Sequence, residues 1–253
     1  MTSGITVRVD VERQGIRVSL RFEEIDWQDT PRGEISLRRR VDPTLGIDVY
    51  EVKLGEEFLM SSLFTVAEIE LARIGLAKAT GEHIDVLVGG LGLGYTAAAA
   101  LEDSRVQTLT VVDAIAPVID WHQRGLLPDT AELLTDPRTH LLEGDFFALV
   151  AGPVGFSQGR PERYDAILLD IDHTPRHVLH PSHSAFYLTE GLNSMRRHLK
   201  PHGVFALWSD DPPDQDFLEV LSGVFAKASA HIVSFPNPLT GGESSNSIYV
   251  GRC

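Results

Sequence analysis

The sequence predicts an α/β protein in which a small N-terminal antiparallel β-domain precedes a seven-stranded, mostly parallel, doubly wound sheet. Two observations carry this prediction. From residue 84 onward, short apolar runs typical of buried strands alternate with helical patterns, and such alternation favours a parallel sheet with helices on both faces. Before residue 62, polar and apolar residues alternate with period two, as in half-buried strands. We therefore expect two domains, residues 1–62 and 63–253.

The first domain is expected to hold four or five antiparallel strands. Period-two patterns occur at residues 5–11, 16–22, 35–41 and 49–54, and glycine- or proline-containing turns separate them. Three consecutive arginines, Arg38 to Arg40, are interpreted as a solvated strand face. Ser61 and Ser62 are expected to cap a helix over residues 63–79.

The second domain is expected to alternate strands and helices. The predicted strands are 84–89, 107–112, 139–142, 164–170, 203–208, 231–235 and 247–250, and the predicted helices are 95–102, 115–125, 146–150, 184–199 and 215–228. Residues 236–245 are too few and too rich in glycine and proline for a crossover helix. The last two strands should therefore form a hairpin, which gives the sheet an antiparallel edge strand.

Composition narrows the class of partner. The apolar share of 43% and charged share of 23% are ordinary for a soluble globular protein. The formal net charge of −14 argues against nucleic acid as a partner and is compatible with a small cationic substrate. The single cysteine, Cys253, excludes an intrachain disulfide. No apolar run approaches the ~20 residues that span a membrane, and no signal peptide is recognisable, so a cytoplasmic location is expected.

A glycine-rich turn is the strongest motif. Gly90, Gly92 and Gly94 join the strand at 84–89 to the following helix, so that a ligand can approach backbone N–H groups closely. Asp113 ends the next strand, where an acidic side chain can accept from both hydroxyls of a ribose. Together these features predict a nucleoside-binding site; the alternative is a tight turn without a ligand.

Other candidate residues follow later strands, because ligands of open α/β sheets lie outside the carboxyl ends of the strands. Gly144 and Asp145 follow the third strand, and Asp145 is expected either to accept from an adenine amino group or to cap the next helix. Asp170, Asp172 and His173 follow the fourth. Asp170 is expected in the site rather than as a strand-end cap, and His173 is near enough to act as a general base.

Two further features are less specific. Four histidines, at positions 173, 177, 180 and 183, lie in an irregular, proline-containing stretch. Because their spacing does not specify convergent ligands, we predict a mobile lid and no metal site. Glu68, in the expected helix before the glycine turn, is either a solvent-facing carboxylate or part of the site.

These residues resemble the spermidine/spermine synthase (polyamine aminopropyltransferase) family from about residue 51 onward. The matching runs are Val86-Leu-Val-Gly-Gly-Leu-Gly-Leu-Gly94, Val112-Asp113, Asp136-Pro-Arg, Glu143-Gly-Asp145, Arg163-Tyr-Asp-Ala-Ile-Leu-Leu-Asp170 and Leu199-Lys-Pro-His-Gly203. The resemblance implies a Rossmann-like fold of the class I AdoMet-transferase type and a sulfonium donor. It also implies that Asp113 holds the ribose, Asp145 the adenine and Asp170 the donor's amine. A homodimer through the N-terminal β-domain is a further expectation.

The chain departs from the family pattern where the family handles amines. The aspartate of the family's GGGDGG turn falls on Gly92, and the second aspartate of its DxxD motif falls on His173, with Asp172 displaced by one. The Tyr-His pair that precedes the family's helix glutamate falls on Val66-Ala67.

These departures bear on the donor. An acid at position 92 would repel the carboxylate of intact S-adenosylmethionine (AdoMet) by about 1 kcal/mol or more. Gly92 removes that repulsion and is expected to expose N–H groups, which favours AdoMet-dependent methyl transfer to a small amine. The alternatives are aminopropyl transfer from decarboxylated AdoMet, with Asp172 or His173 replacing the missing acid, and a catalytically silent nucleoside-binding or oligomerisation module. An NAD oxidoreductase is disfavoured, because the matches extend well past the glycine turn.

Overall fold

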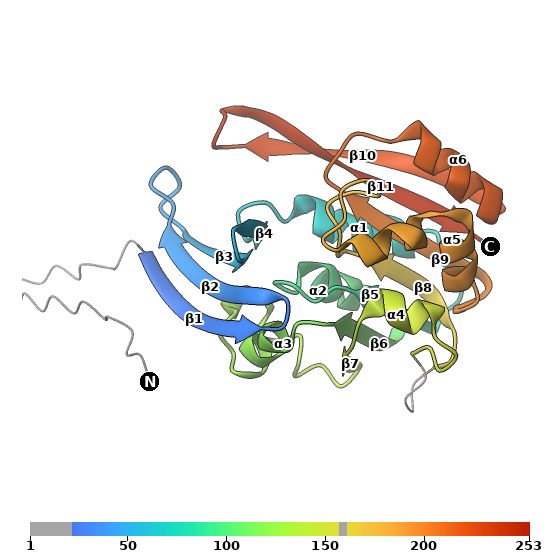
Figure 1. Cartoon of the computed structure of the whole chain (residues 1–253), viewed down its shortest axis with the longest axis horizontal. Coiled ribbons are helices and arrows are strands. Elements are labelled where there is room, and N and C mark those ends of the chain that lie inside the picture. Colours follow the sequence, from blue (N-terminus) through green and yellow to red (C-terminus); the bar gives the residue numbers. More distant parts are fainter. Residues whose placement is uncertain (1–21, 157–160) are drawn as a thin grey trace, which may run out of the picture.

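The computed structural model describes residues 22–156 and 161–253, and it contains the two predicted sheets (Figure 1). The first is antiparallel, with four strands in the order β1-β2-β3-β4. Its strands are β1 (Phe22–Thr30), β2 (Gly33–Val41), β3 (Asp48–Leu54) and β4 (Glu57–Ser61). The second sheet has seven strands and is mostly parallel. The predicted fold class is thus confirmed.

Charge pairs with β2 explain why β1 forms a strand, although its sequence lacks the period-two pattern. β1 is acidic and largely exposed, so it lacks an apolar alternation. It pairs with the arginines of β2, where Arg39 Nη2 lies 2.9 Å from Glu23 Oε2 and Arg38 Nη2 lies 3.7 Å from Glu24 Oε2. Cross-strand charge pairs of this kind stabilise a sheet modestly. The strand predicted at 5–11, and all but the last residue of that at 16–22, lie outside the described residues.

The large sheet has the order β10-β11-β9-β8-β5-β6-β7. Its strands are β5 (Ile84–Gly89), β6 (Val106–Asp113), β7 (Thr139–Glu143), β8 (Tyr164–Leu169), β9 (Leu199–Ser209), β10 (Lys227–Asn237) and β11 (Gly242–Arg252). β11 runs antiparallel to both β9 and β10.

The prediction of a reversed edge strand was wrong in one respect. The reversed strand, β11, lies inside the sheet, and β10 forms the edge. Burial explains the order: Ile248 and Tyr249 of β11 are both 0% exposed, as an interior strand requires, whereas Ile232 of β10 is 64% exposed.

The helices are α1 (Val66–Leu76), α2 (Tyr95–Leu101), α3 (Ala116–Gln123), α4 (Phe146–Ala151), α5 (Thr189–Arg196) and α6 (Gln215–Val224), with short 3₁₀ segments η1 (Pro128–Thr130) and η2 (Pro181–Tyr187). α1 begins after Thr65, not after Ser62, because the Ser62 hydroxyl accepts from Tyr50 N–H instead. The helix predicted at 184–199 is divided among η2, α5 and the start of β9. Extended backbone at Leu188 separates η2 from α5.

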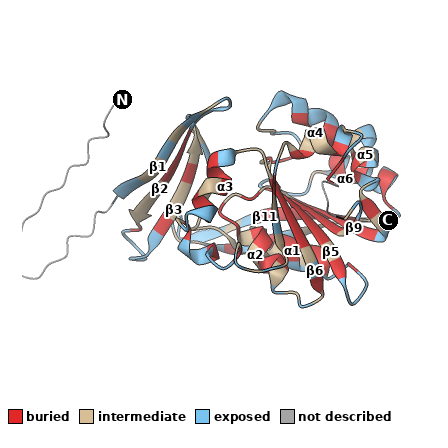
Figure 2. Cartoon of the chain, turned by 90° about the horizontal axis from the view of Figure 1, so that it is seen from below, coloured by how far each residue is buried: buried red, intermediate tan, exposed pale blue. Residues whose placement is uncertain are grey.

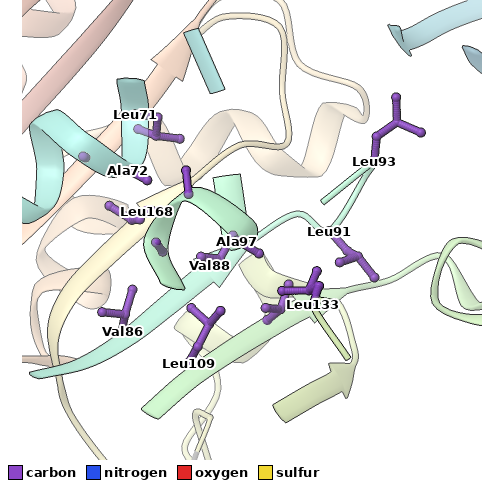
Figure 3. Packing of buried hydrophobic residues seen from close by; sticks show 14 of the residues in the cluster. Leu71, Ala72, Val86, Val88, Leu91, Leu93, Ala97, Leu109, Leu133 and Leu168 are labelled. Carbon is purple, nitrogen blue, oxygen red and sulfur yellow. The ribbon is translucent and has the colours of Figure 1, made fainter. Parts of the chain in front are cut away.

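Two apolar layers enclose the sheet. Helices α1, α2 and α3 contribute to the cluster on one face, and α4, α5 and α6 to the cluster on the other (Figure 2). Figure 3 shows Leu71 and Ala72 of α1 above Val86 and Leu168 of the sheet. Among the described residues, none of the helices has the length and apolarity needed to cross a membrane.

A hydrogen bond links the N-terminal sheet to helix α3, which packs on the large sheet. Trp121 of α3 is fully buried, and its Nε1–H donates to Asp26 Oδ2 of β1 at 2.6 Å. This bond anchors the N-terminal hairpin beside α3, so that the turn between β1 and β2 reaches the carboxyl edge of the large sheet.

Candidate functional site

A cavity of about 480 Å³ lies at the carboxyl ends of the parallel strands. A second, smaller cavity of about 60 Å³ adjoins it around the glycine turn and shares part of its lining. Most of the predicted site residues line the larger cavity, namely Gly90, Gly92, Asp113, Gly144, Asp145, Asp170 and His173. Gly94 lines the smaller one, and Asp172 lines neither. β4 contributes Leu59 and Met60 to both cavities.

The glycine turn and Asp113 form one unit. Asp113 Oδ2 accepts from Leu91 N–H at 2.9 Å, and Oδ1 accepts from Ile115 N–H at 2.8 Å. Burial raises the pKa of Asp113, while these hydrogen bonds oppose the rise. Gly90 has φ +95°, and a Cβ there would collide with the Asp170 carbonyl oxygen. A glycine is therefore required at position 90.

Gly92 lies beside the side chain of Met60, at the position where the sequence suggested an open anion site. A Cβ at this position would lie 2.6 Å from Met60 Sδ, so the thioether of Met60 fills the space of a side chain. The Gly92 N–H is directed to the Asp113 carboxylate, and the Gly92 carbonyl accepts from His122 Nε2 at 2.9 Å. This amide lowers the pKa of Asp113, and the expectation that position 92 offers N–H groups to a donor carboxylate stays a prediction.

Two half-buried carboxylates line the smaller cavity and interact electrostatically. Asp170, at the end of β8, accepts from Thr96 Oγ1 of α2 at 2.7 Å. Glu68 of α1 lines the same cavity. Burial and the charge of Asp170 raise the pKa of Glu68 to about 8, and burial raises the pKa of Asp170 to about 6. A pair of acids with raised pKa values is a site at which a cation would be favoured.

The sequence does contain a signal for Glu68. Leu71 and Ala72, three and four positions later, are both 0% exposed, so Glu68 stands on the apolar stripe of α1. A carboxylate on such a stripe faces the interior rather than solvent.

Asp172 is not positioned to receive a proton from a substrate. Its side chain is fully buried, and its oxygens accept from Leu179 N–H at 2.7 Å, Tyr187 Oη at 2.8 Å and His183 Nδ1 at 2.9 Å. The prediction that Asp172 acts as a base is therefore not supported. This carboxylate instead holds together the segment that carries three of the histidines.

His173 does line both cavities. Its Nε2 lies 3.1 Å from Glu57 Oε1, and its ring centroid is 4.9 Å from that of His177. Within the described ranges, no group of three or more His, Cys, Asp or Glu side chains is arranged to hold a metal ion.

Each oxygen of the Asp145 carboxylate is used structurally. Oδ1 caps α4 by accepting from Phe147 and Ala148 N–H, and Oδ2 lies 3.0 Å from Arg32 Nη2. Burial acts against ionisation, but the hydrogen bonds from Ala148 and Arg32 lower the pKa of Asp145. The helix-cap alternative is thus observed. Arg32, from the β1–β2 turn, was missed, because nothing in the local sequence shows which distant strand end this turn reaches.

The chain was compared with known proteins. No family model and no curated protein matches it. Among solved structures, it is similar to a spermidine synthase in complex with the transition-state analogue AdoDATO, with 17% identity, a TM-score of 0.70, and coverage of 90% of this chain and 73% of the other. It is also similar to spermidine synthase from Thermotoga maritima, with 16% identity, a TM-score of 0.67 and coverage of 90% and 72%.

A probable spermidine synthase from Corynebacterium glutamicum matches with 16% identity, a TM-score of 0.61 and coverage of 90% of this chain and 79% of the other. At such identities the likeness concerns the fold. The resemblance inferred from the motifs is confirmed at that level: the chain has a spermidine-synthase-like fold, with an AdoMet-methyltransferase-like sheet and a small antiparallel sheet before it.

Proposed function

We propose that the chain is a transferase that moves an aminopropyl group from decarboxylated AdoMet to a small amine. The observation that carries the proposal is the pair of carboxylates, Glu68 and Asp170, in the cavity beside the glycine turn. The three solved structures reported above are described as spermidine synthases, one of them as a probable one, and one holds the analogue AdoDATO. Methyl transfer, the first expectation from the sequence, is accordingly replaced.

Charge distinguishes the two donors. The described residues that line the smaller cavity include Glu68 and Asp170 but neither lysine nor arginine. With a pKa of about 6, Asp170 is ionised near neutral pH, so it attracts an ammonium group and repels the additional carboxylate of intact AdoMet. A bound ammonium would also favour ionisation of Glu68. At 4 Å and an effective dielectric constant of 20, one such charge pair contributes about 4 kcal/mol. Met60 Sδ also occupies the Cβ direction of Gly92, beside the space that was expected to receive the carboxylate.

The larger cavity suits the nucleoside. Asp113 keeps a lone pair free beside the Leu91, Ile115 and Gly92 amides directed at it, and this would accept from a ribose hydroxyl. Gly90 and Gly144 also line this cavity, and we assign its end beside Asp145 and Phe147 to the base. These residues would hold the donor, whose sulfonium supplies the electrophilic carbon.

The reaction is an in-line displacement. The lone pair of the acceptor nitrogen forms a bond to the aminopropyl carbon, the carbon–sulfur bond breaks, and its electron pair remains on sulfur in methylthioadenosine. The nitrogen then loses a proton. We assign Asp170 to the positioning of an amine and His173 to the acceptance of that proton, since both line the junction of the two cavities.

Product analysis tests the proposal. The protein is incubated with a diamine and either decarboxylated AdoMet or intact AdoMet, and the products are identified by mass spectrometry. Release of methylthioadenosine with an aminopropylated amine is expected from the decarboxylated donor alone. Formation of S-adenosylhomocysteine and a methylated amine would contradict the proposal. Binding of both nucleosides with no product from any amine would indicate a silent nucleoside-binding module.

A further inference from the structure

A buried cluster beside the larger cavity is not used by the proposed reaction. It consists of Asp172, His183 and Tyr187, which are 1%, 3% and 4% exposed. The Asp172 carboxylate accepts from the Tyr187 hydroxyl at 2.8 Å and from His183 Nδ1 at 2.9 Å. Since an ionised carboxylate is only an acceptor, Nδ1 must carry a proton.

When the imidazole of His183 is neutral, its opposite nitrogen is a hydrogen-bond acceptor. In a neutral imidazole with a protonated Nδ1, Nε2 holds a lone pair. His183 lines the larger cavity, and in the described part of the chain no hydrogen-bond partner is found for its Nε2. The ring is stacked on Phe147, with centroids 3.9 Å apart and planes 25° apart, so its orientation is fixed from two sides.

His183 lies near Asp145, at the end of the cavity to which the proposed function assigns the base. Phe147 follows Asp145 by two residues, and Asp145 and His183 are close enough to interact electrostatically. The Asp145 carboxylate, however, is already bound by two amides of α4 and by Arg32. A polar group that enters this end would therefore meet the unpartnered Nε2 of His183 as its most available acceptor.

We propose that His183 Nε2, held in this tautomer by Asp172, selects a 6-aminopurine over a 6-oxopurine at the base end of the cavity. The exocyclic amine of a 6-aminopurine offers N–H donors to Nε2, whereas a 6-oxopurine opposes it with an oxygen lone pair. The inference rests on the proposed function, because it takes the larger cavity to be the nucleoside site. Asp172 is then a positioning residue that acts through His183.

The test compares two nucleosides that lack the donor's charged tail. Binding of 5′-methylthioadenosine and 5′-methylthioinosine is measured by calorimetry at pH 8. We expect the natural protein to bind the adenine compound about tenfold or more tightly than the inosine compound, since a mismatch leaves polar groups unpaired. A preference below about threefold would overturn the inference.

Two variants assign the preference to His183. His183→Asn keeps an N–H that can reach Asp172 but removes the ring nitrogen that faces the cavity, and His183→Phe keeps the stack on Phe147. In both variants the preference for 5′-methylthioadenosine over 5′-methylthioinosine should fall to about twofold or less. Tyr187→Phe, which removes one bond to Asp172 without changing the imidazole, is the matched control and should retain it.

The outcomes are separable. A preference unchanged in both His183 variants overturns the inference, and loss of the preference in Asp145→Asn alone would make Asp145 the residue that selects the base. If the natural protein binds neither nucleoside, the proposed donor site itself fails. Transfer of an aminopropyl group without any base preference would contradict only the role of His183.

Discussion

The thioether of Met60 lies where a side chain at position 92 would have to stand, since a Cβ on Gly92 would be 2.6 Å from Met60 Sδ. Met60 belongs to β4 of the N-terminal sheet, and Gly92 belongs to the glycine turn of the large sheet. This contact closes the position at which the resembling family carries an acid. The carboxyl groups beside the turn are instead those of Glu68 and Asp170, of which Asp170 is ionised near neutral pH.

Gly92→Ala should be destabilising mainly through its φ of +48°, with a smaller cost for moving the flexible end of the Met60 side chain. We expect a loss of about 1–3 kcal/mol in the free energy of unfolding, measured by urea denaturation. Gly125→Ala is the matched control, because Gly125 has φ +67° but open space around its Cβ position, and it should lose only about 1 kcal/mol. Equal losses of unfolding free energy in the two variants would show that the contact with Met60 adds no cost at position 92.

Asp113→Ala should weaken the binding of methylthioadenosine by about 1–3 kcal/mol, because charge-assisted hydrogen bonds to the ribose are lost. The substitution also frees the Leu91 and Ile115 amides, which Asp113 holds at 2.9 and 2.8 Å. Asp113→Asn, which keeps one acceptor oxygen, should lose less. Calorimetry checks both variants, and unchanged affinity in a folded Asp113→Ala protein would exclude Asp113 from the site.

The raised pKa of Glu68 predicts a pH-dependent stability. A glutamate in the unfolded chain loses its proton near pH 4.5, whereas Glu68 in the folded protein keeps it to about pH 8. Between these values the folded state binds more protons, so the contribution of Glu68 to the free energy of unfolding falls as the pH rises. Above about pH 8 the loss is complete.

Glu68→Gln should remove this decline. We expect the stability of the variant relative to the natural protein to increase by about 1–3 kcal/mol between pH 5 and pH 9, a value discounted because the side chain is half-buried rather than enclosed. Denaturation at both pH values measures it. Glu70→Gln, in the same helix, is the control, since Glu70 is paired with Arg73 at 3.1 Å. A parallel pH dependence in all three proteins would contradict the prediction.

His173→Gln should lower turnover ~10²–10⁴-fold with little change in donor affinity, because glutamine cannot accept a proton near neutrality. Asp172→Asn should act differently. It disturbs a buried carboxylate with three hydrogen bonds, so it should lower stability by about 1–3 kcal/mol. Steady-state kinetics and thermal unfolding of both variants distinguish the two roles. Full turnover in His173→Gln would assign the proton to another group.

The strand-end rule predicted much of the site from sequence. Asp113, Asp145 and Asp170 were expected together because parallel strands end at one edge of a sheet, and all three line the larger cavity. The rule could not separate Asp172 from its neighbour His173. These residues follow the strand on irregular backbone, and their directions depend on Tyr187 and His183, which lie more than ten positions away.

The residues that the N-terminal sheet contributes to the site could not be predicted from the sequence either. Arg32 reaches the site from the hairpin that the Trp121–Asp26 hydrogen bond joins to α3, and Met60 reaches it from β4. That contact joins residues 95 positions apart. The interior position of β11 likewise depends on which strand can be buried on both faces, which the hairpin pattern alone does not specify.

Competitive binding of the two donors tests the central claim most directly. The account predicts that decarboxylated AdoMet binds at least about tenfold more tightly than intact AdoMet, which corresponds to about 1.4 kcal/mol. It also predicts that Glu68→Gln combined with Asp170→Asn narrows the difference, because both acids of the smaller cavity are then neutral. Equal or tighter binding of intact AdoMet by the natural protein would contradict the account.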